Sequence, residues 1–142
     1  MTAYNEAFFG GMQNFFIEIY DTEGKEIALQ RMAGALGRGL SKAYDTLGFE
    51  TGSIDDFACV VGIRDETVGL SVEFRKENDC LHYIFHTDPF PNLKKYVTAK
   101  EIDATYIPFK IKYLLGDGWK YKTIKHLWNG DSCTEHVIEM KL

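Results

Sequence analysis

Cysteine is scarce in this sequence, and no long apolar run is present. The three cysteines, Cys59, Cys80 and Cys133, are odd in number and widely spaced, with no CxxC pair. This pattern argues against a disulfide scaffold, a zinc ribbon and a thioredoxin-like site. No apolar stretch approaches the roughly 20 residues that a membrane-spanning helix needs. Gly10-Gly11 interrupts the early aromatic residues, unlike the apolar core of a signal peptide. We therefore expect a cytoplasmic protein without a membrane span.

Positive charge is also in short supply. Lys and Arg total 16 against 21 Asp and Glu, which gives a net charge of −5. Binding to a phosphate backbone requires clustered basic residues. The densest basic runs are Lys94-Lys95 and the alternating Lys120, Lys122 and Lys125. Such alternation is typical of the solvent-facing side of a strand, so nucleic acid is not an expected partner.

The composition that remains is that of one globular domain. The chain has 142 residues, of which 45% are hydrophobic and 14% aromatic. A chain of this length buries roughly 68–70% of the surface that its unfolded form exposes, so one core can stabilise it. No repeat, linker or low-complexity segment divides it. We predict a single domain over residues 1–142, mainly helical over 1–64 and sheet-forming over 65–142.

Three helices are predicted in the first half of the chain. Apolar spacings of three and four residues indicate one helix before residue 21 and a longer one over about residues 24–47, which Gly48 ends. A third helix follows over about residues 53–63. Ser53 is placed to cap it, and Asp55-Asp56 suit its positive N-terminal end. The predicted buried stripes are Phe8, Met12, Phe15 and Ile19, then Leu29, Ala33, Leu36, Leu40, Ala43 and Leu47, and finally Ile54, Phe57, Ala58 and Val61.

Small residues interrupt the second of these helices. The run Ala33-Gly34-Ala35 is followed by Gly37 and Gly39. Glycine destabilises a helix interior, so close approach of another group is the usual reason for it. The group that approaches could be another segment of the same chain, a second copy in a dimer, or a ligand lying against bare backbone.

In the second half, the apolar period changes to two residues, which indicates strands. Residues 68–75 and 81–85 are predicted to form one hairpin, and residues 119–128 and 133–141 a second one across Asn129-Gly130. The region between them, 93–116, is helical in pattern, and Pro108 must kink or divide it. The predicted class is α+β: N-terminal helices packed on an antiparallel sheet of about four strands, made of two hairpins with a helical region between them. The apolar stripe of that region is Ile102, Tyr106, Phe109 and Tyr113.

No strong catalytic motif is present, since the sequence contains no P-loop, GxGxxG, HExxH or GxSxG pattern. His82 and His86 lie four residues apart. In a strand this spacing separates them by roughly 13 Å, so they cannot share one metal ion. No set of residues predicts a cofactor or metal site.

Candidate catalytic residues gather in the last hairpin. If Asn129-Gly130 forms a two-residue turn, His126 lies opposite Cys133. If residues 129–132 all form the loop, His126 lies opposite Glu135, and Trp128 opposite Cys133. A thiol beside an imidazole can act as a thiolate nucleophile, but a lone cysteine is also a common small core residue. Either pairing gathers His126, Asp131, Cys133, Glu135 and His136 within a short stretch.

The segment from Ser53 to the end resembles a known family. A strand ending at HTDPF (His86–Phe90), a helical region and then LWNGDSC (Leu127–Cys133) follow one another in the order seen in the aminothiazoline-carboxylate hydrolase-like family. That family is similar to the 4-vinyl reductase-like small-molecule-binding domains. The resemblance implies an α/β fold that holds small or hydrophobic ligands between helices and sheet. The chain departs from the family at Asp88, where relatives carry cysteine, and at Ala104-Thr105, where a further cysteine is absent.

Three functions are compatible with these observations. The first is binding of a small, partly apolar molecule. The second is hydrolysis of a small cyclic C–N or C–S compound, with Cys133 or Asp88 as nucleophile or base and His126 or His136 as proton carrier. The third is a homodimer or other assembly in which the glycine-rich helix packs on a partner. The predicted ligand-binding residues are Phe109, Tyr106, Trp128, His136 and Asp131.

Overall fold

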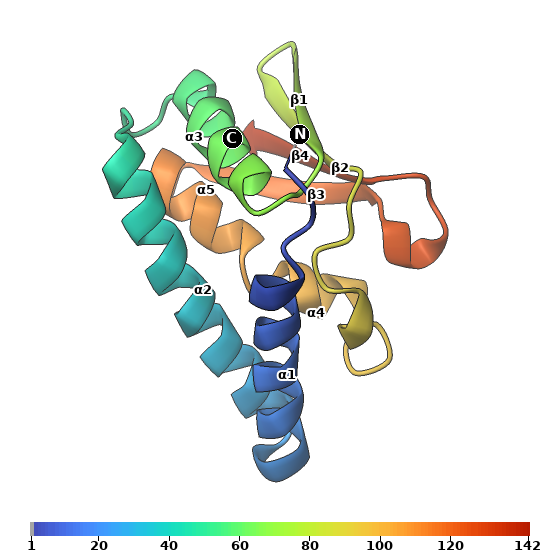
Figure 1. Cartoon of the computed structure of the whole chain (residues 1–142). Helices are drawn as coiled ribbons and strands as arrows, with labels where there is room; N and C mark the ends of the chain where they lie inside the picture. The colour runs from blue at the N-terminus through green and yellow to red at the C-terminus, as the bar shows by residue number, and fades with distance from the viewer. Residues whose placement is uncertain (1) are drawn as a thin grey trace.

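The structure is a computed structural model that describes residues 2–142. A helical hairpin comes first, then a third helix, a strand hairpin, a helical region and a second strand hairpin (Figure 1). The elements are α1 (Glu6–Glu23), α2 (Lys25–Leu47), α3 (Ile54–Thr67), β1 (Val72–Glu77), β2 (Cys80–Phe85), η1 (Pro91–Leu93), α4 (Ala99–Asp103), α5 (Ile107–Leu115), β3 (Trp119–Lys125), η2 (Leu127–Asn129) and β4 (Thr134–Met140).

The four strands form one antiparallel sheet in the order β1-β2-β4-β3. Each hairpin supplies two neighbouring strands, and the pairing of β2 with β4 joins the two hairpins. The α+β class with two hairpins is therefore confirmed. β2 and β4 lie in the centre, where most of their residues are buried, whereas β1 and β3 form the edges. The lysines of β3 suit an exposed edge, because charged side chains there oppose pairing with another chain.

The helices cover one face of the sheet (Figure 1). Tyr83 of β2 lies opposite Phe74 of β1 and His136 of β4, and all three contribute to that face. Strand residues alternate between the two faces, so His82 and Glu135 point to the other side. There the His82 ring Nδ1 lies 2.6 Å from a Glu135 carboxylate oxygen. The sheet thus separates an aromatic core from a layer of charged pairs.

The buried stripes of the helices differ from the predicted ones. In α1 the buried residues are Phe9, Gln13, Phe16 and Ile19, and in α2 they are Ala28, Met32, Leu36, Gly37 and Tyr44. The spacing of apolar residues did not predict the burial of Gln13, because glutamine is a polar residue. Its amide donates to the Phe9 carbonyl at 3.1 Å, and its carbonyl accepts from the Asn92 amide at 2.8 Å, so burial leaves it with partners. In α2, residues at intervals of four positions face the core. Leu47, which was predicted to be buried, is exposed.

The start of the first strand was also predicted wrongly. Helix α3 continues to Thr67, and Val68 and Leu70 are buried in a connection that precedes β1. Gly69 has a φ of 84°, and a Cβ atom there would lie 2.0 Å from the Ala3 carbonyl oxygen. The N-terminal segment crosses at this point, held by the Asn5 amide donating to the Val68 carbonyl at 3.0 Å. This contact with the N-terminal segment occupies the residues before Val72, where β1 begins.

Both predicted pairings of the last hairpin are wrong. Thr123 lies opposite His136 and Lys125 opposite Glu135, with an irregularity between Thr123 and Lys125. β3 ends there, and His126 becomes the residue that caps the short helix η2. Since an irregularity of this kind inserts a residue into one strand, every later position is displaced from the ideal ladder.

The helical region is divided as Pro108 required. Pro108 lies in the first turn of α5, where its missing N–H costs no hydrogen bond. The buried face of α5 is Ile107, Lys110, Ile111, Leu114 and Leu115, so the predicted Phe109 and Tyr113 are only half-buried. The prediction that Ser53 caps α3 is confirmed, because its side chain accepts from the Asp56 amide at 3.1 Å. Among residues 2–142, no helix combines the length and apolarity that a membrane crossing requires.

Candidate functional site

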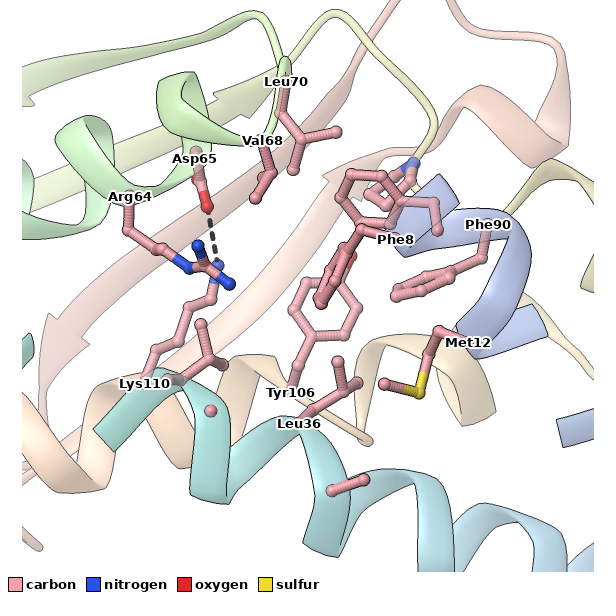
Figure 2. Close-up of a pocket in the computed structure, with 15 residues that line it drawn as sticks. Phe8, Met12, Leu36, Arg64, Asp65, Val68, Leu70, Phe90, Tyr106 and Lys110 are labelled. Carbon is pink, nitrogen blue, oxygen red and sulfur yellow. Dashed lines mark hydrogen bonds and ion pairs between the residues drawn. The ribbon is translucent and has the colours of Figure 1, made fainter. Parts of the chain in front are cut away.

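A cavity of about 70 Å³ lies where α1, α2 and α5 meet the end of α3 and the connection to β1. Its walls are mostly apolar, and three charged side chains occupy one end (Figure 2). This combination of an apolar lining with a few convergent polar groups is typical of small-molecule sites. The lining residues are Phe8, Phe9, Met12, Ala35, Leu36, Gly39, Leu40, Arg64, Asp65, Val68, Leu70, Pro89, Phe90, Tyr106 and Lys110.

The small residues of α2 have two different roles. Gly37 contacts the Phe109 ring, whose nearest carbon would lie 3.3 Å from a Cβ atom at position 37. Packing within the chain therefore explains Gly37. Gly39 lines the cavity, and a Cβ atom there would meet nothing within 4 Å. Ala35 lines the same wall, so α2 presents nearly bare backbone to this space.

Aromatic rings form the apolar end of the cavity. Phe9 packs edge-on against Phe8 at 4.9 Å and against Phe90 at 5.7 Å between ring centroids. Phe90 in turn lies 5.7 Å from Tyr106. Edge-to-face geometry of this kind is favourable for aromatic pairs. Met12 completes this end (Figure 2), and its flexible thioether can adapt to a ligand of variable shape.

The polar end is a buried cluster of Asp65, Tyr83 and Lys110. The Lys110 Nζ atom lies 3.3 Å from a carboxylate oxygen of Asp65 and donates to the Tyr83 hydroxyl at 2.8 Å. The Tyr83 hydroxyl donates to the other oxygen of Asp65. The side chains of Asp65 and Lys110 are each only 3% exposed. Three elements, α3, β2 and α5, thus bring one hydrogen-bonded triangle together.

Burial changes the acidity of this cluster. It lowers the pKa of the Lys110 ammonium group; the carboxylate of Asp65 opposes this change and Arg64 adds to it. Burial likewise raises the pKa of Tyr83 well above its ordinary value, and the charge of Asp65 raises it further. The rings of Tyr83 and Tyr106 each lie 5.2 Å from the Lys110 Nζ atom. Lys110 is therefore a cation held away from water by aromatic rings, with one carboxylate partner.

Arg64 adds a second positive charge to the cavity wall. Its guanidinium group lies over the Phe8 ring at 5.5 Å from the centroid, and Figure 2 shows it beside the Asp65–Lys110 pair. Within residues 2–142, Arg64 forms no ion pair. With Lys110 and Asp65, the cavity carries one excess positive charge, which favours an electron-rich group on a ligand.

Asp65 and Lys110 were not predicted as site residues, although the sequence contains a signal for each. Asp65 follows Phe57 and Val61 by eight and four residues, so it falls on the buried stripe of α3. Lys110 falls on the buried face of α5, between Ile107 and Ile111. A charged residue inside an apolar stripe is rarely buried unless it is paired. Two such residues of opposite sign therefore indicate a buried pair.

Of the eight predicted site residues, only Tyr106 lines this cavity. Asp88, His126 and Trp128 surround a second, nearly filled space of about 10 Å³, which shares Tyr106 as a wall. The Trp128 indole N–H donates to the Asp88 carboxylate at 2.7 Å. The His126 Nε2 atom lies 3.2 Å from an Asp103 carboxylate oxygen. These side chains are partners of one another, and the space between them is too small for a substrate.

His126 has no free nitrogen for a reaction with Cys133. The Trp128 amide donates to the His126 Nδ1 atom at 3.0 Å, so the ring proton is on Nε2 and faces Asp103. The Asp131 carboxylate accepts from the His126 amide at 2.8 Å. Cys133 is buried. Its thiol makes no hydrogen bond to any residue in the range 2–142.

His136 and Phe109 lie apart from this group. His136 is fully buried on the helix-covered face of the sheet, where its Nδ1 atom lies 2.8 Å from the Thr123 hydroxyl. Burial lowers its pKa to about 4. Its Nε2 atom has no hydrogen-bond partner among the described residues. Phe109 stacks on Tyr113 at 5.3 Å and packs against α2, so it supports the cavity wall from behind.

No known protein family matches this sequence, and no curated protein matches it. Within residues 2–142, no group of three or more His, Cys, Asp or Glu side chains is arranged to hold a metal ion. The cavity and its polar cluster are therefore the basis for a functional proposal.

Proposed function

We propose that this protein binds a small organic molecule with an apolar body and one hydrogen-bond-accepting group. The binding site is the cavity between α1, α2 and α5. The observation that carries the proposal is the buried Asp65–Lys110–Tyr83 cluster at one end of an otherwise apolar cavity.

The apolar part of the ligand would lie against Phe8, Phe90 and Tyr106, and against the bare backbone at Gly39. Burying apolar ligand surface there contributes roughly 25 cal/mol per Å². The cavity, about 70 Å³, is half the size of the roughly 150 Å³ cavity that holds benzene. A ligand of more than a few heavy atoms must therefore displace the flexible Met12 or the half-buried Phe8.

The polar part of the ligand would face Lys110 and Arg64. Lys110 has three N–H donors, and Asp65 and Tyr83 accept two of them. The third is available to an oxygen or nitrogen acceptor on a ligand. Such a hydrogen bond to a charged donor is worth about 1.5–3 kcal/mol. Residues 53–142 resemble the aminothiazoline-carboxylate hydrolase-like family. That family is in turn similar to the 4-vinyl reductase-like small-molecule-binding domains, which favours the same function.

The alternatives of hydrolysis and self-association have weaker support. Hydrolysis by Cys133 with His126 as its base has weaker support, since both nitrogens of His126 already have partners. Gly37 packs on Phe109 of the same chain. A dimer contact is therefore not needed to explain this glycine in the helix. Both hypotheses remain predictions.

The test combines mass spectrometry with a variant of the cavity wall. Native and denaturing spectra of freshly purified protein would reveal a retained ligand as an added mass lost on denaturation. Amide shifts in a ¹⁵N-labelled sample titrated with butan-1-ol would then map the binding site. We expect the shifts to centre on Leu36, Gly39 and Tyr106.

Gly39→Leu adds a bulky side chain at the exposed part of the cavity wall on α2 and should abolish these shifts. Gly11→Leu is the matched control, because Gly11 is an exposed helical glycine on α1 with nothing within 4 Å of an added Cβ atom. It should leave them unchanged. Shifts that lie elsewhere, or that persist in Gly39→Leu, would refute the proposed site.

A further inference from the structure

We propose that Lys110 forms a reversible imine with small aldehydes or ketones that enter the cavity. This inference rests on the proposed function, because it requires that the cavity admit a ligand. It identifies the accepting group of the ligand as a carbonyl oxygen and adds a covalent step to binding.

The position of Lys110 meets the geometric requirements of such a step. Its side chain lines the cavity, and its Nζ atom is held at 3.3 Å from Asp65 and 2.8 Å from Tyr83 (Figure 2). The rings of Tyr83, Phe85 and Tyr106 surround the amine at 5.2–5.8 Å from their centroids. A lysine in an aromatic, water-poor setting is the kind that enzymes use for imine formation.

The amine must be neutral to attack a carbonyl carbon. Burial lowers the pKa of Lys110, and the nearby charge of Arg64 acts in the same direction. Asp65 opposes them by stabilising the ammonium form, but it also provides an acceptor for the departing proton. Lys112, on the same helix, offers a reference, because its side chain is 77% exposed.

The step balances in atoms and charge. The Lys110 ammonium group transfers one proton to Asp65, and the nitrogen lone pair then forms a bond to the carbonyl carbon while the C=O π bond breaks. The alkoxide oxygen takes up the proton from Asp65 and a second one from the nitrogen. It leaves as water when the C=N bond forms. The product is a protonated imine, so the charge beside Asp65 remains +1, and no oxidant, reductant or metal is needed.

A purely structural ion pair is the competing explanation. Buried ion pairs add little to stability compared with apolar residues of the same volume. A structural pair would also gain nothing from a place in a cavity wall, next to a second cation without an ion-pair partner. Imine formation uses all three features: the cavity admits the carbonyl compound, Asp65 relays the proton, and Arg64 disfavours the charged amine.

The test is trapping by reduction in the full-length protein. Protein at neutral pH is mixed with butanal and cyanoborohydride for a short time, and the butylated lysines are identified by peptide mapping. We expect Lys110 to be labelled faster than Lys112, because burial and the charge of Arg64 favour the neutral amine at position 110. Gly39→Leu should remove the labelling of Lys110 and leave that of Lys112 unchanged.

A second variant separates reactivity from folding. Lys110→Arg retains the positive charge and the pairing with Asp65 but cannot form an imine. It should keep the wild-type fold, as judged by amide shifts of residues remote from the cavity, and should lose the fast labelling. If this variant does not fold, the comparison of Lys110 with Lys112 in the wild type still decides the question.

The outcomes separate the two proposals. Binding of butan-1-ol with Lys110 labelled no faster than Lys112 would overturn the imine and leave the binding function intact. Fast labelling of Lys110 that Gly39→Leu does not reduce would overturn the role of the cavity in the reaction. Absence of both butan-1-ol binding and fast labelling would refute the proposed function together with this inference.

Discussion

Replacing Lys110 with methionine removes the cation of the buried cluster and leaves the carboxylate of Asp65 in an apolar setting. Both side chains are 3% exposed, so solvent cannot compensate. Breaking a buried pair by removing one partner costs about 3–5 kcal/mol of unfolding free energy. Asp65→Leu should cost a similar amount, because it leaves the ammonium group unpaired.

Removing both charges should be much less harmful than either single change. Exchanging a buried pair for apolar residues of similar volume is often neutral or stabilising. The remaining cost comes from the Tyr83 hydroxyl, which loses its hydrogen-bond acceptor. An unsatisfied buried donor lowers the free energy of unfolding by about 1–3 kcal/mol. We therefore expect the double variant to be more stable than each single variant, with a total loss of about 1–3 kcal/mol.

Urea unfolding followed by circular dichroism measures these differences. With a slope of about 2 kcal/mol per M, a loss of 4 kcal/mol lowers the midpoint by about 2 M. Lys112→Met is the matched control on α5, because Lys112 and its partner Asp117 are both largely exposed. It should leave the midpoint unchanged. If the losses of the two single variants simply add in the double variant, the two charges do not stabilise each other and the assignment of the cluster is wrong.

Two further predictions concern other buried features. Burial lowers the pKa of His136 from 6.5 to about 4, so the unfolded chain binds the proton more readily and stability falls as the pH drops from 6.5 towards 4. The wild type should lose about 2 kcal/mol between pH 7 and pH 5 beyond the loss seen in His136→Gln, and equal losses in urea unfolding would contradict this. Gly69→Ala should destabilise the fold by at least about 2 kcal/mol, because the added Cβ atom would collide with the backbone of Ala3. Gly24→Ala, with a similar φ of 92° and nothing within 4 Å, should cost only about 1 kcal/mol; equal losses in the two variants would show that the N-terminal contact is unimportant.

Local features of the sequence determined much of this fold. The Ser53 hydroxyl caps a helix. Gly48 ends another helix because glycine readily adopts a positive φ, and the ring of Pro108 divides a helical region. The change of apolar period near residue 70 separated helices from strands. Each of these depends on residues within a few positions of one another, so a single sequence is sufficient to predict them.

Other features depended on contacts between distant segments. Which stripe of α2 is buried, and where β1 begins, follow from packing against α1 and the N-terminal segment. The candidate site is of the same kind: Asp65 and Lys110 are 45 residues apart in sequence. The sequence by itself determined the α+β class, the two hairpins and the presence of a charged residue on each of two apolar stripes. Only the tertiary structure decided that those two residues meet beside a cavity, because an ion pair and a cavity depend on how helices and sheet pack in space, not on local periodicity.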